Sequence, residues 1–337
     1  MAANYTELPP GYYPGWMPTY ETCDEVTWYC PIEYTTLGYA PNYGLNIFLA
    51  VAYGLAAVLT IVIGVWKKTW AFSIPVGSGC ILECTGYIGR SILSHNVWNG
   101  DAFKLQIVAI VLGPTLVCAG LYLTLGYVVE ALDRTLSRFP PRFYPIFFIP
   151  ADVSCLVIQA IGGGIAAAAG YDNPGLLVHG NRTIMAGVAL QVVVLAFFGL
   201  SGADFLIRAR KSFKQGGNNA TNTSSSSDTL TGSALLAQRN FRLFLIAVIS
   251  AYSAILIRCI YRIAEMAGGW ANPIMQHESS FVVLESFMVL IACWLLSIFA
   301  PGIFFPQMAH GFGKKGRSGG EVEKPAVEGD TTGAETA

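Results

Sequence analysis

The sequence predicts an all-α, polytopic membrane protein with seven transmembrane helices, its N-terminus outside and its C-terminus cytosolic. Of the 337 residues, 53% are hydrophobic and 12% are charged, and the mean hydropathy is +0.50. Soluble domains carry about 25% charged residues, so this chain has too few charges to cover a soluble globule. The net charge of −1 provides no field that would attract nucleic acid, and we expect no nucleic-acid partner.

Seven apolar segments have the roughly 20 residues that a membrane-spanning helix requires. They cover residues 45–66, 70–93, 105–129, 146–169, 184–207, 243–263 and 281–305. Each is predicted to be a helix because hydrocarbon offers no partners for open backbone. The second and sixth segments contain ions and give the weakest signals, so six spans is the alternative. The chain then divides into an extracellular segment (1–41), a transmembrane domain (42–306) and a disordered cytosolic tail (307–337).

The distribution of Lys and Arg predicts the orientation. Fifteen of the 20 basic residues lie in alternate segments, namely the loops after the first, third and fifth helices and the C-terminal tail, whereas residues 1–41 contain none. Basic residues concentrate on the cytosolic side of membrane proteins. The fifth loop includes a Gly-, Asn-, Ser- and Thr-rich stretch, 214–233, that has too little apolar surface to fold and is expected to be flexible.

The first 41 residues lack the apolar stretch of a cleavable signal, so we expect the first helix to act as its own anchor. Cys23 and Cys30 are the only cysteines outside the apolar segments. On the oxidising side of a membrane they are expected to pair, with two free thiols as the alternative. The sequon Asn4-Tyr5-Thr6 predicts glycosylation of Asn4, and an unused sequon is the alternative.

The sequence lacks the residue patterns that several functional classes require. There is no GxxxxGK[ST] loop, so ATP is not expected to be the direct energy source. The four histidines fall in loops or at helix ends and do not converge with carboxylates as a zinc hydrolase would need. The last helix has no Lys for a retinal Schiff base, and Ser, His and Asp do not occur at matching depth for a triad. We expect no enzyme, no metal and no cofactor.

Ionisable residues within the predicted helices are the candidate site. A charge at mid-bilayer costs roughly 2.5–3.5 kcal/mol on insertion scales, so it needs a partner or a wet cavity. In the second helix, Glu83, Tyr87 and Arg90 are spaced to share one face. The other candidates for substrate binding are Asp152, Gln159, Arg258, Arg262, Glu265 and Glu285. Together they predict a polar cavity, and the alternative is that they pair off as contacts between helices.

Small residues predict a site of close helix packing, and a proline predicts a kink. Gly162, Gly163 and Gly164, followed by the alanines 166–169, predict a close packing face. Pro114 is expected to kink the third helix.

These segments resemble a known family. They are Glu83-x-x-Gly86-Tyr87-x-x-Arg90, Pro114 through Tyr122, Asp152 to the 159–164 run, Gly187-x-x-x-Gln191, and Arg258-x-x-x-Arg262-x-x-Glu265 with Gly268, Glu278 and Glu285. In this order, over about residues 42–302, the chain resembles the fungal lipid-translocating exporters, seven-helix proteins named for resistance to aminocholesterol. The resemblance implies export or flipping of sphingoid bases and phospholipids, or resistance to toxic amphiphiles. The family commonly ends its last helix with His-Pro-Gly, whereas this chain has Ala300-Pro301-Gly302.

The physical reading agrees with that implication. A helix bundle with an ionic groove can carry a charged head group while the tails stay in lipid. Asp152 and Glu83 are suited to a cationic amine, and Arg90, Arg258 and Arg262 to phosphate.

Two other functions remain open. One is a receptor-like sensor of lipid or stress, since Asp133-Arg134-Thr135 follows the third helix, although the last helix lacks an Asn-Pro-x-x-Tyr element. The other is transport of a porphyrin or another amphiphile. The expected partners are membrane lipids or amphiphilic small molecules, and no protein partner is indicated. We expect a multi-pass protein of the plasma membrane, with an internal membrane as the alternative.

Overall fold

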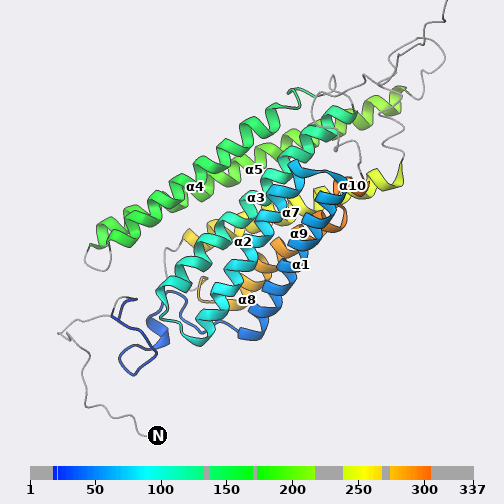
Figure 1. Ribbon diagram of the computed structural model, residues 1–337. Coiled ribbons are helices and arrows are strands. Elements are labelled where there is room, and N and C mark those ends of the chain that lie inside the picture. The colour runs from blue at the N-terminus through cyan, green and yellow to red at the C-terminus, as the bar shows by residue number, and fades with distance from the viewer. Residues whose placement is uncertain are drawn as a thin grey trace, which may run out of the picture.

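The computed structural model describes residues 18–20, 22–132, 137–169, 173–216, 238–267 and 274–304. All regular structure in these ranges is helical, and the long helices run side by side (Figure 1). The predicted all-α class is therefore confirmed. The Asn4 sequon, Gly268, the Asp133-Arg134-Thr135 motif and the 307–337 tail lie outside the described residues.

Seven helical segments form the bundle. They are α1 (Tyr43–Lys67), α2 (Trp70–His95), α3 (Gly100–Leu132), α4 (Phe143–Ala169), α5 (Pro174–Gly216), α7 (Arg239–Ala267) and a last composite segment made of α8 (Glu278–Phe281), η3 (Val282–Phe287), α9 (Met288–Ile298) and α10 (Pro301–Phe304). Among the described residues, six of these segments are long and apolar enough to cross a membrane. The seventh, α2, has 26 residues but a weaker hydropathy signal, because Glu83 and Arg90 interrupt it.

Hydropathy underestimated the length of α5. The prediction covered 184–207, whereas the helix has 43 residues and runs from Pro174 to Gly216. Residues 214–216, expected to open the flexible stretch 214–233, are therefore helical, and that part of the prediction is wrong. Hydropathy reports only the lipid-compatible part of a helix. The polar end that contains Arg208, Arg210 and Lys211 continues the helix because these residues have high helix propensity.

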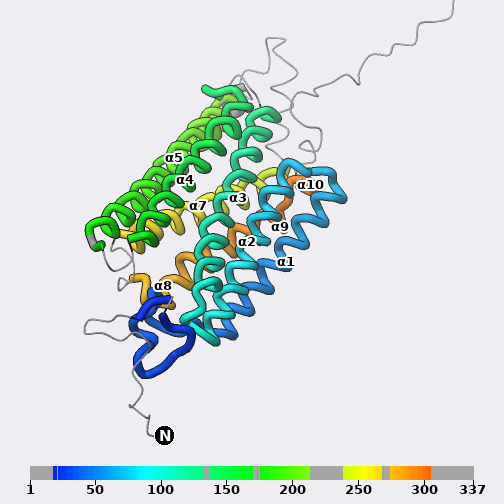
Figure 2. Tube along the Cα trace, turned by 60° about the vertical axis from the view of Figure 1, so that its left-hand side comes forward, coloured from blue at the N-terminus to red at the C-terminus, as the bar shows by residue number. Residues whose placement is uncertain are grey.

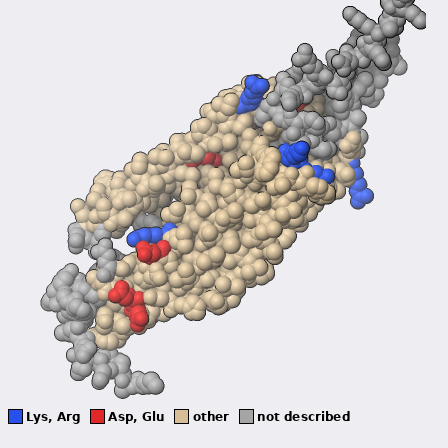
Figure 3. All heavy atoms as spheres, in the orientation of Figure 1, with Lys and Arg blue, Asp and Glu red and all other residues tan. Residues whose placement is uncertain are grey.

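The helices divide into a main group and an attached pair. Helix α2 packs between α1 and α3, and α9 packs against α1 and α7. Helices α4 and α5 pair with each other and contact the rest mainly through α3 and α7, as the green helices in Figure 2 show. A broad surface almost free of charges separates the charged groups at the two ends of the molecule (Figure 3). This surface suits contact with lipid tails.

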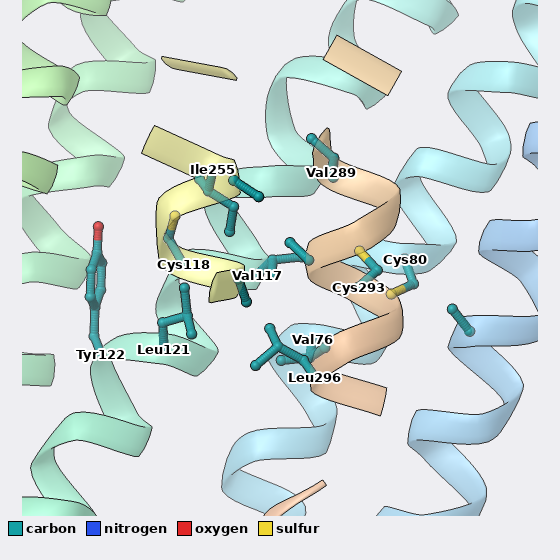
Figure 4. Close-up of a cluster of buried hydrophobic side chains, with 14 of the residues drawn as sticks. Val76, Cys80, Val117, Cys118, Leu121, Tyr122, Ile255, Val289, Cys293 and Leu296 are labelled. Carbon is teal, nitrogen blue, oxygen red and sulfur yellow. The ribbon is translucent and has the colours of Figure 1, made fainter. Parts of the chain in front are cut away.

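The main core lies where α2, α3, α7 and α9 meet. Val76, Val117, Ile255, Val289 and Leu296 contribute buried side chains to it, and Figure 4 shows them between these helices. Tyr122 stands apart from these residues, on the side of α3 toward α4 (Figure 4). Helix α3 thus faces the main core with one side and the α4–α5 pair with the other.

The α4–α5 pair is held by close backbone contact at one of the predicted glycines. A Cβ on Gly162 would lie 2.6 Å from the amide nitrogen of Ile184, so no larger residue fits without displacement. Gly163 and Gly164 have no neighbour within 4 Å of such a Cβ. The predicted packing face is therefore wrong for these two positions. They lie on the other side of α4, because successive helical residues are rotated by 100°.

The segment before α1 covers one end of the bundle. Cys23 and Cys30 form a disulfide, and Trp98, in the α2–α3 connection, donates from Nε1 to the Cys30 carbonyl over 2.9 Å. Asn96 donates from its side chain to the Asp24 carbonyl over 2.6 Å. We call this the disulfide end, formed by residues 18–20, 22–41 and 96–99.

Candidate functional site

A buried ion pair joins α7 to the last composite segment. Arg258 donates from Nε and Nη2 to Oε1 of Glu285, over 2.9 Å and 2.5 Å. The two side chains are 3% and 1% exposed. Nη2 also donates to the Ile110 carbonyl of α3 over 3.1 Å, so one guanidinium ties three helical segments together.

Pro114 explains why the Ile110 carbonyl is available. In an α-helix that carbonyl would accept the amide hydrogen of the residue four positions later, and proline has none. Helix α3 nevertheless continues through Pro114 from Gly100 to Leu132. Arg258 supplies the donor that the helix lacks.

A π-helical turn carries the carboxylate partner. Residues Val282–Phe287 form η3, which contains Glu285 and Ser286. The Tyr53 hydroxyl donates to the Ser286 carbonyl over 2.7 Å, across from α1. Single π-turns within helices are frequent at functional sites, and this one places its glutamate against α7.

Glu83 is the second buried carboxylate in this region. It is 1% exposed, and its Oε1 has no hydrogen-bond partner in the described part of the chain. Among charged side chains, Arg258 and Glu285 have the strongest electrostatic effect on it. A Cβ at Gly113 would lie 2.8 Å from this Oε1, so glycine is what lets the carboxylate approach α3. The predicted Tyr87 is also buried, and its ring stacks on that of Tyr53 at 5.3 Å.

Arg90 is buried toward the disulfide end without a carboxylate in ion-pair range among the described residues. It donates to the Tyr39 hydroxyl over 2.5 Å and to Gln106 Oε1 over 3.3 Å. Its guanidinium lies 4.2 Å from the Phe281 ring centroid, and its Nε has no partner there. Burial raises the pKa of Tyr39 above its ordinary value although Arg90 opposes the shift, so the hydroxyl stays protonated at neutral pH.

Arg262 and Glu265 pair within one turn of α7. Nη1 donates to Oε2 over 2.5 Å, and the side chains are 15% and 2% exposed. Arg262 also interacts electrostatically with Glu285 and Arg258. We call Glu83, Arg90, Arg258, Arg262, Glu265 and Glu285 the charged cluster. It holds three carboxylates and three guanidinium groups.

Asp152 lies apart from the charged cluster, on α4. It is 2% exposed, and its Oδ2 accepts a hydrogen bond from the Tyr122 hydroxyl over 2.6 Å. Its Oδ1 has no partner among the described residues. One Asp152 oxygen is thus buried without a hydrogen-bond partner in the part of the chain that the structure describes.

The remaining candidate, Gln159, belongs to a chain of amides. It donates to Gln191 of α5 over 3.1 Å, and Gln191 donates to the Thr115 hydroxyl of α3 over 3.2 Å. These bonds join α4, α5 and α3, which is how polar side chains hold helices together in lipid.

Sequence reasoning missed five partners of these groups. They are Tyr39, Gln106, the Ile110 carbonyl, Tyr122 and Phe281. The sequence could have indicated that the Ile110 carbonyl needs a donor, because it lies four residues before a proline within a helix. No sequence pattern could have indicated Tyr39 and Phe281, since their contacts with Arg90 depend on how segments distant in sequence come together.

The fold and the buried charges define a multi-pass helical membrane protein whose ionisable side chains point into the bundle. The chain belongs to the family described as RTA1 like protein, whose model matches residues 76–308.

Named relatives come from Saccharomyces cerevisiae. The sphingoid long-chain base transporter RSB1 of strain Lalvin EC1118 is 32% identical over 283 residues, covering 80% of this chain and 74% of the relative. Protoporphyrin uptake protein 1 is 28% identical, covering 69% and 68%. Protein RTM1 is 27% identical, covering 71% and 69%. No solved structure gives a significant match.

Proposed function

We propose that this chain moves amphiphilic lipids, sphingoid bases and phospholipids, across the membrane and thereby confers resistance to toxic amphiphiles. The observation that carries the proposal is the charged cluster inside an apolar bundle, with Glu83 Oε1, Arg90 Nε and Glu285 Oε2 left without partners among the described residues. A buried polar group without a partner costs about 1–3 kcal/mol. If these charged side chains served only to pack helices together, we would expect each of their polar atoms to have a hydrogen-bond partner within the protein. The relative named as a sphingoid long-chain base transporter supports the same function.

The cluster is suited to head groups of mixed charge. Glu83 and Glu285 each offer a free oxygen to an ammonium group, and Arg90 offers a free N–H to a phosphate. The hydrocarbon tails stay among the lipid-facing side chains, so the bundle has only the head group to carry.

The orientation and the compartment are part of the proposal. The basic residues favour an external N-terminal segment, 1–41, ahead of the transmembrane domain, 42–306, with residues 307–337 as a cytosolic tail. The Cys23–Cys30 disulfide supports an oxidising environment at that end. We place the protein in the plasma membrane.

Porphyrin transport is the second candidate. One relative is named as a protoporphyrin uptake protein, and Arg90, without an ion-pair partner in the described chain, is suited to a carboxylate as well as to a phosphate. The sensor hypothesis depends on Arg134, which lies outside the described residues.

Reconstitution tests the proposal. Purified protein in liposomes without ATP should move a fluorescent sphingoid base or phospholipid between leaflets faster than empty vesicles do. Arg90→Ala and Glu265→Gln should slow this movement at equal amounts of folded protein. Lys104→Ala is the control, because that side chain is 78% exposed. If the native protein moves neither lipid under any pH gradient, the proposal fails. If the variants slow movement only in proportion to lost folded protein, the charges are packing contacts.

A further inference from the structure

A basic pocket lies at the end of the bundle opposite the disulfide end, where α5 finishes and α7 begins (Figure 1). Its volume is about 310 Å³. It is lined by Arg210 of α5 and by Arg242, Leu245, Ile246 and Ile249 of α7. None of these residues belongs to the charged cluster, so the pocket is a separate feature of the molecule.

The two arginines of the pocket differ from their neighbours in having no counter-charge. Arg138 and Arg208 both pair with Asp204, over 3.2 Å and 3.0 Å. Arg210 and Arg242 form no ion pair with a carboxylate in the described part of the chain, and no acidic side chain there lines the pocket. Two guanidinium groups on one pocket repel each other, and an anion between them would be stabilised by both.

The α7 wall of the pocket changes from basic to apolar along the helix. Its four residues are spaced at i, i+3, i+4 and i+7 and therefore share one face. Arg242 lies in the first turn of α7, Leu245 is buried behind it, and Ile249 is exposed further along. A molecule lying along this face meets the charge first and then the hydrocarbon. A phospholipid presents its groups in the same order.

Both arginines also lie at the depth of a phospholipid head group. The apolar segment of α5 ends at residue 207, and that of α7 begins at residue 243. Arg210 and Arg242 therefore flank the hydrocarbon region on the same side of the membrane, whereas Ile246 and Ile249 lie within it. Because α5 remains helical to Gly216, Arg210 is held beside the first turn of α7.

We propose that this pocket binds one anionic phospholipid, with its phosphate between Arg210 and Arg242 and an acyl chain along Ile246 and Ile249. Basic pockets between membrane-spanning helices are a general way to bind anionic lipid head groups. At about 30 Å³ per water, the pocket equals about ten waters, which suits a phosphate and its glycerol but not two acyl chains. The chains therefore lie mainly in the bilayer.

The inference goes beyond the proposed transport, because this lipid is a bound ligand rather than cargo. It would bridge α5 to α7, which are two of the helices through which the α4–α5 pair joins the main group. The pocket selects by charge. A zwitterionic lipid brings its own ammonium group close to the two guanidinium groups, which repel it, whereas an anionic lipid does not.

Native mass spectrometry of the full chain, purified in detergent and freed of bound lipid, tests the inference. The probe is phosphatidylglycerol, and the matched probe is phosphatidylcholine with the same acyl chains. The native protein should retain one phosphatidylglycerol in preference to phosphatidylcholine. Arg210→Ala and Arg242→Ala should each weaken binding of the anionic lipid about fivefold, the factor expected for one cationic contact near a lipid surface. Lys211→Ala is the matched control, because Lys211 is an exposed cation of α5 that does not line the pocket.

A second pair of variants tests the apolar half of the pocket. Ile249→Trp fills the space along which the acyl chain would lie and should weaken binding of phosphatidylglycerol. Ile257→Trp is the control, because Ile257 is also on α7, is 45% exposed against 42% for Ile249, and does not line the pocket. Glycerol 3-phosphate, which has no tails, should not displace the lipid even in large excess. Displacement would assign the pocket to a free phosphate and overturn the lipid assignment.

The remaining outcomes are equally direct. Equal retention of the two lipids, or unchanged binding in Arg210→Ala and Arg242→Ala, overturns the inference. Binding that is lost in Arg90→Ala but kept in those two variants places the lipid at the charged cluster and also overturns it. None of these measurements depends on lipid movement, so this inference and the proposed transport can fail independently.

Discussion

Removing the carboxylate of Glu285 should be one of the most damaging single changes in the bundle. The pair with Arg258 is 3% and 1% exposed, so Glu285→Gln leaves the guanidinium without its ion-pair partner in a low-dielectric interior. Breaking a buried pair by removing one partner costs about 3–5 kcal/mol. An unfolding entropy of about 2.1 cal/mol/K per residue gives about 1.4 °C per kcal/mol for a chain of 337 residues. We therefore expect a loss of about 4–7 °C in melting temperature.

The double variant Arg258→Met, Glu285→Met should recover most of this loss, because replacing a buried pair by apolar residues is often neutral. It does not recover all of it. The Ile110 carbonyl loses the donor that Arg258 Nη2 supplies, at a cost of about 1–3 kcal/mol. Adding Pro114→Ala to the double variant restores an amide hydrogen to that carbonyl and should regain a similar amount.

The assay is heating of purified protein in one detergent, followed by size-exclusion chromatography with fluorescence detection. Asp101→Asn is the control, because the Asp101 side chain, which pairs with Lys104, is 99% exposed. This variant should have the same melting temperature as the native protein. A Glu285→Gln variant that melts within about 2 °C of the native protein would refute the reasoning. A triple variant no more stable than the double would refute the role of Pro114.

Three further predictions concern the topology, the disulfide and the packing of α2 on α3. In intact cells an antibody should reach an epitope tag placed near Asn4 and should not reach one inserted within residues 216–228; the reverse would overturn the orientation. External thiol reagents should label Cys23 and Cys30 only after reduction, because they form a disulfide, and labelling of both without reductant would contradict it. Gly113→Ala should destabilise the protein by about 1–3 kcal/mol, as overpacking does, because its Cβ would lie 2.8 Å from a glutamate oxygen of α2. Melting at the native temperature would show that the glutamate moves aside freely.

The sequence located the ionisable residues well and their partners poorly. Spacing along a helix placed Glu83 and Arg90 on one inward face, and both are buried. It did not show that Arg90 contacts Tyr39, from the segment before α1, while Glu83 lies against Gly113. Helical periodicity gives the direction of a side chain relative to its own helix. It does not give the rotation of the neighbouring helix or the path of a distant segment.

The sequence by itself determined the class of protein, because lipid solubility depends on local composition and every long apolar segment must satisfy its own backbone. It also determined the family, through short motifs in a fixed order. Only the tertiary structure decided that Arg258 binds both Glu285 and the carbonyl freed by Pro114, and that the Gln159 amide is linked through Gln191 to Thr115. Both depend on packing between three helical segments, and contacts between separate helices are set by side-chain fit at the interface rather than by the order of residues along any one of them.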